Sequence, residues 1–398
     1  MPSLSQRGVI MPPSPIRKLV PFADQAKEKG RHVYHLNIGQ PDIHTPETYW
    51  NAIEHHGRKV LEYGPSAGLT SYRKKLVTYY RRFNINVDYE NIIVTTGGSE
   101  AIIFTLMAIT DPGDEIIIPE PFYTNYNGFA VEAAAKIVTI TSDIEDDFQL
   151  PPIESIREKI NTRTRAIMIC NPNNPTGYVY SRDEMDALRK IVREHDIFLL
   201  ADEVYREFCY DGLAHTSVMH LTGIDDQAVL LDSISKRYSA CGARIGCIVT
   251  KNREILDATL KFGMARLCPP TLEQLGAEAG IETPRDYFDS VLEEYTERRN
   301  AMVEALRAMP GVTAPNPRGA FYLVARLPVD DADNFARWLL TDFHINNETV
   351  MIAPANGFYS TPGLGRNEVR IAYVLNTEDI KKAMHILAEA LKVYPGKI

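Results

Sequence analysis

The sequence lacks the features that define several large classes of protein. No stretch approaches the roughly 18 consecutive apolar residues of a membrane-spanning helix, so no membrane partner is expected. The first residues, MPSLSQRGVIMPPSPIRKL, lack the long apolar region of a secretory signal. There is no internal repeat and no low-complexity tract. With 44% hydrophobic and 24% charged residues, the composition is that of a globular protein.

Disulfide candidates and an excess of positive charge are also missing. The five cysteines are odd in number, irregular in spacing and never paired as CxxC, which predicts reduced thiols in the cytoplasm. A net charge of −9 argues against nucleic acid as the main partner. It leaves open a small anionic ligand held by local arginines. The cysteines are Cys170, Cys209, Cys241, Cys247 and Cys268.

The middle of the chain alternates between short apolar segments and helical ones. Nearly all-apolar strands separated by helices predict a mostly parallel sheet that is covered on both faces. Ligands of such sheets bind beyond the carboxyl ends of the strands. The predicted strands are 92–96, 115–120, 166–170, 197–203, 228–233 and 245–250.

The two ends of the 398-residue chain differ from this middle part, and its length favours two domains. A long amphipathic helix at 286–309 precedes strand-like segments at 320–327 and 368–374, which predicts a smaller α+β domain. Residues 15–30 favour a helix, whereas the prolines among the first residues predict an extended arm. The predicted parts are an N-terminal arm at 1–15, a large domain at 46–285, and a small domain formed by 16–45 and 286–398.

Polar motifs follow several of the predicted strands. Gly97-Gly98-Ser99-Glu100 opens a helix whose free backbone N–H groups could bind an anion, although a tight turn explains the glycines equally well. The string CNPNNPTG at 170–177 is more specific than a generic turn. Asp202 ends an apolar strand, with Tyr205 three positions later. Taken alone, such an aspartate is most often a helix cap or a surface carboxylate.

The segment SISKRYSACGARIG, at 233–246, follows another apolar strand. It places Lys236 among hydroxyl-bearing and small residues, and Arg244 follows eight positions later. A solvated loop accounts for the segment when it is taken alone. The alternative is a nucleophilic lysine beside groups that hold a phosphate.

Together, NPNNPTG, DEVY and SISK with an arginine eight residues on resemble the class I/II aminotransferases of fold type I, which depend on pyridoxal 5′-phosphate (PLP). The match extends from about residue 15 to the C-terminus. The sequence is most similar to the short-chain subgroup of bacterial aspartate aminotransferases. The resemblance implies an α/β fold with a seven-stranded, mostly parallel sheet between helices, beside a smaller α+β domain, and no metal ion.

The resemblance also implies how PLP would be bound. Lys236 would bond covalently to the cofactor and then move the substrate's α-proton. Asp202 would keep the ring nitrogen protonated, so that the ring withdraws electrons. Asn174 and Tyr205 would hydrogen-bond the phenolic oxygen. The other implied cofactor residues are Gly98, Ser99, Glu100, Ser233 and Arg244 at the phosphate, and Tyr123 stacked on the ring. A core aromatic is the less favoured alternative for Tyr123.

Further residues are implied at the substrate. Arg370 in NEVRIAYV would bind the α-carboxylate, although an edge-strand salt bridge is an alternative, and Gly39 in LNIGQPD would lie against the substrate. Tyr63 in EYGPSAG would reach the phosphate of the neighbouring subunit, which implies a homodimer with shared active sites. The resemblance also implies a cis peptide at Asn174–Pro175, with Glu120–Pro121 as a second candidate.

One position departs from the pattern of the aspartate enzymes. Relatives often carry a lysine directly after the Gly-Gly pair, where it binds the distal carboxylate of the substrate. Here that residue is Ser99, followed by the acidic Glu100. Arg266 in MARLCPP, from the same or the second subunit, is the nearest basic candidate. Aspartate and 2-oxoglutarate are the leading substrates, while alanine, aromatic and branched-chain donors stay open.

Other protein classes share part of the pattern. A C–S β-lyase or an aminocyclopropane-carboxylate synthase would use the same cofactor residues and differ in its product. A non-enzymatic regulator on this fold usually carries an N-terminal helix-turn-helix domain, and the motifs begin too early for one. A nicotinamide dehydrogenase would need a strand–GxGxxG–helix unit followed by an acidic residue, which is absent. The sequence therefore predicts a PLP-dependent aminotransferase.

Overall fold

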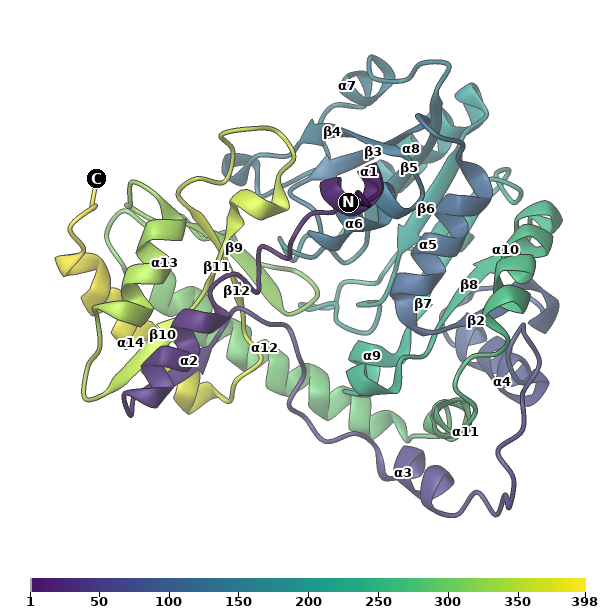
Figure 1. Cartoon of the computed structure of the whole chain (residues 1–398), viewed down its shortest axis with the longest axis horizontal. Helices are drawn as coiled ribbons and strands as arrows, with labels where there is room; N and C mark the ends of the chain where they lie inside the picture. Colours follow the sequence, from purple (N-terminus) through teal and green to yellow (C-terminus); the bar gives the residue numbers. More distant parts are fainter. Residues whose placement is uncertain (1) are drawn as a thin grey trace.

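A seven-stranded sheet forms the centre of the larger lobe in the computed structural model, which describes residues 2–398 (Figure 1). Its strands, in order across the sheet, are β2 (Ile92–Thr95), β8 (Gly246–Thr250), β7 (Ala228–Ser233), β6 (Phe198–Asp202), β5 (Thr164–Cys170), β3 (Glu115–Glu120) and β4 (Lys136–Thr141). All strands run in the same direction except β8, which pairs antiparallel with β2 and β7. The predicted mostly parallel sheet is confirmed, although the sequence did not reveal the edge strand β4.

The strands of this sheet supply side chains to two hydrophobic cores, one on each face. Met168 of β5 packs into the first core and Ile169 into the second, because successive side chains of a strand point to opposite faces. The helices of the larger lobe in the first core are α5 (Gly97–Ile109), α6 (Asn125–Glu132) and α10 (Arg253–Arg266). The helices in the second core are α3 (Glu47–Glu54), α4 (Thr70–Arg81), α7 (Ile153–Arg157), α8 (Arg182–His195) and α11 (Thr271–Gly280).

The smaller lobe contains a three-stranded sheet and a separate pair of strands. Strand β12 (Glu368–Ala372) lies between β11 (Ala353–Pro354) and β9 (Tyr322–Arg326), antiparallel to both. Strand β1 (His32–His35) pairs in parallel with β10 (Glu348–Met351). The helices packed with these strands are α2 (Val20–Glu28), α12 (Arg285–Arg307), α13 (Ala332–Thr341) and α14 (Thr377–Val393). The domain boundaries drawn from the sequence stay a prediction.

Short helical segments complete the described chain. One of them is important for the site, because it follows β7 and carries the lysine of the SISK motif. These segments are α9 (Ile234–Arg237) and the 3₁₀ turns η1 (Tyr89–Asn91), η2 (Ile144–Asp146), η3 (Val218–His220), η4 (Cys241–Ala243) and η5 (Ala355–Phe358).

The N-terminal arm is not extended throughout, which corrects the prediction. A short helix, α1 (Gln6–Ile10), begins after Ser5, whose hydroxyl caps it by accepting the Gly8 N–H at 3.2 Å. The three prolines that disfavour helix all lie beyond the end of α1, so they do not prevent it. Met1 lies outside the described residues.

After α1, the chain crosses from the larger lobe to the smaller one (Figure 1). Met11 packs against Gly128 of α6, where an added Cβ would lie 3.2 Å from the Met11 Cε. Pro15 packs against Gly357 of η5, where an added Cβ would lie 2.4 Å from the Pro15 Cβ. This crossing segment, residues 11–19, therefore contacts both lobes within a few residues.

The structure also corrects the predicted cis peptide. The cis bonds among the described residues are Glu120–Pro121 and Asn171–Pro172, while Asn174–Pro175 is trans. Asn171–Pro172 and Asn174–Pro175 have the same intrinsic preference, so the sequence could not distinguish them. Within the described residues, the structure contains no helix that is long and apolar enough to cross a membrane.

Candidate active site

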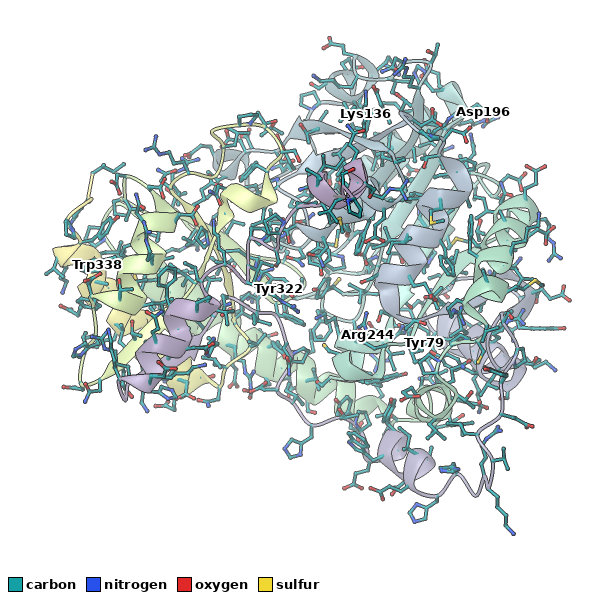
Figure 2. All side chains as sticks on the ribbon, in the orientation of Figure 1. Tyr79, Lys136, Asp196, Arg244, Tyr322 and Trp338 are labelled. Atoms are coloured by element: carbon teal, nitrogen blue, oxygen red, sulfur yellow. The ribbon has the colours of Figure 1, made fainter. Side chains whose placement is uncertain are left out.

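The carboxyl ends of β5, β6 and β7 open on one cavity of about 440 Å³. Because β8 is antiparallel to β7, its beginning lies at the same edge, which brings Arg244 close to Lys236. Figure 2 shows Arg244 on the larger lobe and Tyr322 on the smaller lobe, where the two lobes meet. The predicted site residues that line the cavity are Gly39, Gly98, Ser99, Tyr123, Asn174, Asp202, Tyr205, Ser233, Lys236, Arg244 and Arg370.

Lys236 projects into this cavity from α9, directly after β7. Its Nζ donates a hydrogen bond to the Gly39 carbonyl at 2.9 Å and lies 3.6 Å from the Cys241 Sγ. The two contacts are a backbone carbonyl and a thiol. The amine is therefore available to a ligand in the cavity.

Buried ion pairs fix the helix that carries this lysine. The Asp232 carboxylate accepts hydrogen bonds from Arg237 at 2.6 Å, from Arg206 at 3.3 Å and from the Tyr80 hydroxyl at 2.8 Å. Burial alone would raise the pKa of Asp232, but Arg237 and Arg206 hold it below its ordinary value. Because Arg237 directly follows Lys236 in the chain, this ion pair fixes the backbone of the lysine.

Asp202 faces the cavity at the end of β6. One carboxylate oxygen accepts a hydrogen bond from the Tyr126 hydroxyl at 2.8 Å, and the other accepts one from the Val204 N–H at 3.3 Å. Burial raises the pKa of Asp202 to about 6, against the opposing effect of the Tyr126 hydrogen bond. A positive charge on a ligand beside this carboxylate would favour its ionised form.

Arg370 is a buried cation that forms no ion pair within residues 2–398. It donates hydrogen bonds to the Asn174 Oδ1 at 3.3 Å and to the Asn37 carbonyl, while its Nε has no partner there. Its guanidinium lies 4.7 Å from the centre of the Tyr322 ring and 4.9 Å from that of Phe358. Burial lowers its pKa. A buried, uncompensated guanidinium complements the carboxylate of a ligand.

Two tyrosines on the cavity wall are held in their protonated form. The Tyr205 and Tyr322 hydroxyls share a hydrogen bond of 2.9 Å, and burial raises the pKa of Tyr205 well above its usual value. The Tyr123 hydroxyl accepts a hydrogen bond from Asn125 at 2.8 Å, and burial raises its pKa to about 12. Both phenols can therefore donate hydrogen bonds at neutral pH.

Two glycines allow the N-terminus of α5 to approach Arg244 and Ser233. Gly97 has a φ of +76°, and a Cβ at this position would lie 2.4 Å from a terminal nitrogen of Arg244. A Cβ on Gly246 would lie 2.7 Å from the Gly98 backbone nitrogen. Backbone N–H groups, a hydroxyl and a guanidinium therefore converge at one place. These donors are suited to a phosphate.

Three predicted residues do not line the cavity. Glu100 turns back over the start of its helix, where its carboxylate accepts the Thr96 N–H at 2.7 Å. The other oxygen of Glu100 lies 3.3 Å from the Nε of Arg266, so this arginine is paired outside the cavity. Tyr63 is 80% exposed in the segment before α4. The roles assigned to Glu100, Arg266 and Tyr63 from the sequence stay predictions.

Sequence reasoning missed several residues of the site. Tyr126 follows Tyr123 by three positions in PFYTNYNG, a spacing that places both on one side of a helical turn and could have revealed it. Tyr322 has the pattern of an ordinary strand residue in AFYLVARL. The crossing segment bears no motif, and only the fold brings it to the strand ends. The missed residues at the site include Ser14, Ile16, Arg17, Asn125, Tyr126, Cys241 and Tyr322.

Comparison with known proteins agrees with this geometry. The family model described as aminotransferase class I and II matches residues 31–387. An aspartate aminotransferase from Pyrococcus horikoshii is 30% identical over 402 aligned residues, which cover 98% of this chain and 97% of that protein. Aromatic-amino-acid aminotransferase 2 from Thermococcus litoralis is 28% identical, with 98% of both chains covered. The solved structure of an alanine aminotransferase from Pyrococcus furiosus matches with a TM-score of 0.90 and 31% identity, over 98% of this chain and all of that one.

The sheet covered on both faces, with a lysine and a buried arginine, unpaired within residues 2–398, in the cavity beyond its strand ends, matches the architecture of the fold type I aminotransferases. The chain belongs to the aminotransferase class I and II family. It is a transaminase, which transfers an amino group between an amino acid and a 2-oxo acid. The predicted family, fold class and enzyme class are confirmed. The three relatives are about equally similar to this chain but are named for three different amino donors.

Proposed function

We propose that this transaminase uses PLP and that aspartate and 2-oxoglutarate are its main substrates. The observation that carries the proposal is the buried Arg370 in the same cavity as Lys236 and Asp202. Arg370 offers a site for a substrate carboxylate, Lys236 an amine that can bond to an aldehyde, and Asp202 a carboxylate for a protonated ring nitrogen. Similarity to an aspartate aminotransferase supports the choice of substrates.

The residues of the cavity fit PLP as a ligand. The cradle at Gly97 and Gly246 would be filled by any side chain, and it is bordered by Arg244, so it suits the phosphate. The carboxylate of Asp202 stands in the same cavity with a raised pKa, which a protonated pyridine nitrogen would reverse. Asn174 and Tyr205 carry donors for the phenolic oxygen.

When bound, PLP supplies an electron sink for the bond that breaks at the substrate's α-carbon. Lys236 would hold the cofactor covalently before the substrate arrives. Its released amine would then take the proton from the α-carbon and deliver it to the carbon that carried the aldehyde, and the second half-reaction would return it. Asp202 keeps the proton on the ring nitrogen, while Tyr126 holds that carboxylate in place. Arg370 binds the α-carboxylate through its guanidinium, which orients the substrate and excludes water from this side.

A homodimer with shared active sites is part of the proposal, and an apolar patch on the larger lobe supports it. Segment 63–69 lies against 263–271, since a Cβ on Gly263 would lie 3.3 Å from the Ser66 carbonyl oxygen and one on Gly64 would lie 3.6 Å from the Thr271 Oγ1. Helix α3 packs against α11, which begins at the end of the second of these segments. Exposed apolar side chains that gather on neighbouring segments are typical of protein interfaces. We call the exposed apolar residues of these segments, of the chain just before Tyr63 and of α3 the apolar patch: Trp50, Val60, Leu61, Tyr63, Met264 and Leu267.

The cysteines support a location in the cytoplasm. All five carry free thiols, and no disulfide forms between them in the structure. Free thiols persist in reducing compartments. We therefore propose the cytoplasm as the site of action.

The test is a panel of amino acids mixed with the PLP-loaded protein while the cofactor's absorbance is followed. Aspartate and glutamate should convert the cofactor from its aldehyde form to its amine form, and 2-oxoglutarate should restore it. Borohydride reduction followed by peptide mapping should place the pyridoxyl group on Lys236, and Lys236→Ala should fold but retain no label. Label on another lysine contradicts the assignment. Release of ammonia and pyruvate without the amine form would instead indicate a lyase.

A further inference from the structure

The cavity contains one more basic side chain than the proposed reaction uses. Among residues 2–398, its lining includes a single carboxylate, Asp202, and four basic residues. In the proposed reaction, Lys236 bonds to the cofactor, Arg244 binds its phosphate, and Arg370 binds the α-carboxylate of the substrate. Arg17, from the segment that crosses between the lobes, has no assigned partner.

Tight packing holds this part of the crossing segment against the smaller lobe. Pro15 lies against Gly357, as described above, and Ile16 packs into a small hydrophobic cluster that contains Phe358. Phe358 is also the residue whose ring lies 4.9 Å from the guanidinium carbon of Arg370. The residue before Arg17 therefore packs against the same hydrophobic cluster that supplies a ring beside Arg370, the arginine suited to the α-carboxylate.

The charge of Arg17 is not neutralised by the protein. Arg17 forms no ion pair within residues 2–398, whereas Lys18 beside it pairs with Asp333. Arg266, the candidate from the sequence, pairs with Glu100 and does not line the cavity. Among the described residues, Arg17 is thus the cation at the cavity that is left to attract a second carboxylate.

We propose that Arg17 binds the distal carboxylate of dicarboxylic substrates and so sets the preference for them. The inference rests on the proposed function, in which Arg370 takes the α-carboxylate. A substrate with a carboxylate at each end then meets a guanidinium at each end, while a monocarboxylic substrate uses Arg370 alone. Burying the distal carboxylate without a cation would be unfavourable, so the charge of Arg17 selects substrates rather than accelerating the reaction of all of them.

Equilibrium binding of an unreactive dicarboxylate isolates this role. Succinate has no amino or oxo group, and butyrate is its counterpart with one carboxylate. With PLP-loaded protein in a calorimeter, Arg17→Met should raise the Kd of succinate by about 10-fold or more and change that of butyrate by less than about 2-fold. Arg17→Lys should recover part of the loss, because it restores the charge. Lys18→Met is the matched control, since it removes the neighbouring charge, and it should leave the Kd of both ligands unchanged.

Kinetics with true substrates should show the same selectivity. In Arg17→Met, kcat/KM should fall by about 10-fold or more for aspartate and 2-oxoglutarate and stay within about 2-fold for alanine. Equal losses for both substrate classes, or no loss for either, would overturn the inference. A selective loss in Arg266→Ala with none in Arg17→Met would overturn it as well. If the wild-type protein transaminates alanine but not aspartate, the proposed substrates are wrong, and the succinate titration still shows whether Arg17 binds a second carboxylate.

Discussion

At the scale of single residues, the buried carboxylate of Asp202 lacks a positively charged partner within residues 2–398, and its pKa shows the effect. Its pKa is raised from 3.8 to about 6, chiefly because the carboxylate is buried. The free protein therefore keeps a proton on Asp202 at pH values where the unfolded chain has already lost it. Stability from this group is fully present below about pH 4 and is lost as the pH rises through about 6.

Asp202→Asn should separate stability from catalysis. Without cofactor at pH 7.5, the variant should be more stable than the wild type by roughly 1–3 kcal/mol, since about two pKa units correspond to roughly 3 kcal/mol. The half-reaction with aspartate should slow by the equivalent of about 3–5 kcal/mol, because the charge opposite the ring nitrogen is lost. Urea unfolding between pH 4 and pH 8 and stopped-flow absorbance measure the two effects. Identical pH profiles for the two proteins, or near-normal turnover of the variant, would contradict this role.

Residues within motifs were predictable, and residues that support them were mostly not. Lys236, Asp202 and Arg370 could be predicted because they stand in motifs that resemble those of a known family, and all three line the cavity. Tyr322 and Arg17 gain theirs only from what the fold places next to them. Glu100 lies within a motif, but its carboxylate accepts the Thr96 N–H at the start of its own helix, and its role at the phosphate stays a prediction.

At the scale of elements, the join between β2 and α5 carries a strict requirement for glycine. Gly97 adopts a φ of +76° and lies beneath the Arg244 guanidinium. Gly97→Ala should cost about 1–3 kcal/mol in backbone strain and should displace Arg244. We expect PLP affinity to fall by about 10-fold or more, measured by fluorescence titration of the cofactor-free protein.

Gly242→Ala is the control for this prediction. Gly242 lies between Lys236 and Arg244 in the sequence. It has no positive φ, and an added Cβ would have no other atom within 4 Å. Its substitution should leave PLP affinity unchanged. If Gly97→Ala binds PLP as tightly as this control does, the cradle does not hold the phosphate.

The elements that the sequence revealed are those with an unambiguous local signal. Strands β3 and β7 match their predicted spans, and β5, β6 and β8 differ only at their ends, because strands buried on both faces are largely apolar. Edge strand β4 was missed although the β-branched residues of KIVTIT favour a strand, because it is only partly buried and lacks the continuous apolar run of the inner strands. Helix α1 was missed because nearby prolines outweighed the Ser5 cap.

At the scale of the whole molecule, the apolar patch predicts how two chains associate. Val60 is 74% exposed and Leu61 is 62% exposed, beside Tyr63. Val60→Glu together with Leu61→Glu should shift a dimer towards monomer in analytical ultracentrifugation at micromolar concentration, because charges are unfavourable in the core of an interface. PLP affinity should fall in the same variant, since Tyr63 would no longer reach the neighbouring site.

Val393→Glu provides the comparison on the other lobe. Val393 is 60% exposed at the end of α14, away from α3 and α11 (Figure 1). This substitution should leave the association state and the cofactor affinity unchanged. A double variant at 60 and 61 that remains dimeric would place the interface elsewhere.

The crossing segment also limits the motion of the two lobes. It is fastened to α6 through Met11 and to η5 through Pro15, and a chain of four residues spans at most about 14 Å even when fully stretched. Its prolines restrict the backbone, so the segment is a stiff linker rather than a flexible one. The two lobes therefore cannot move far apart where this segment joins them. A movement that opens the cavity would separate the lobes on the opposite side. We therefore expect substrates to enter and products to leave on the side of the cavity away from the crossing segment.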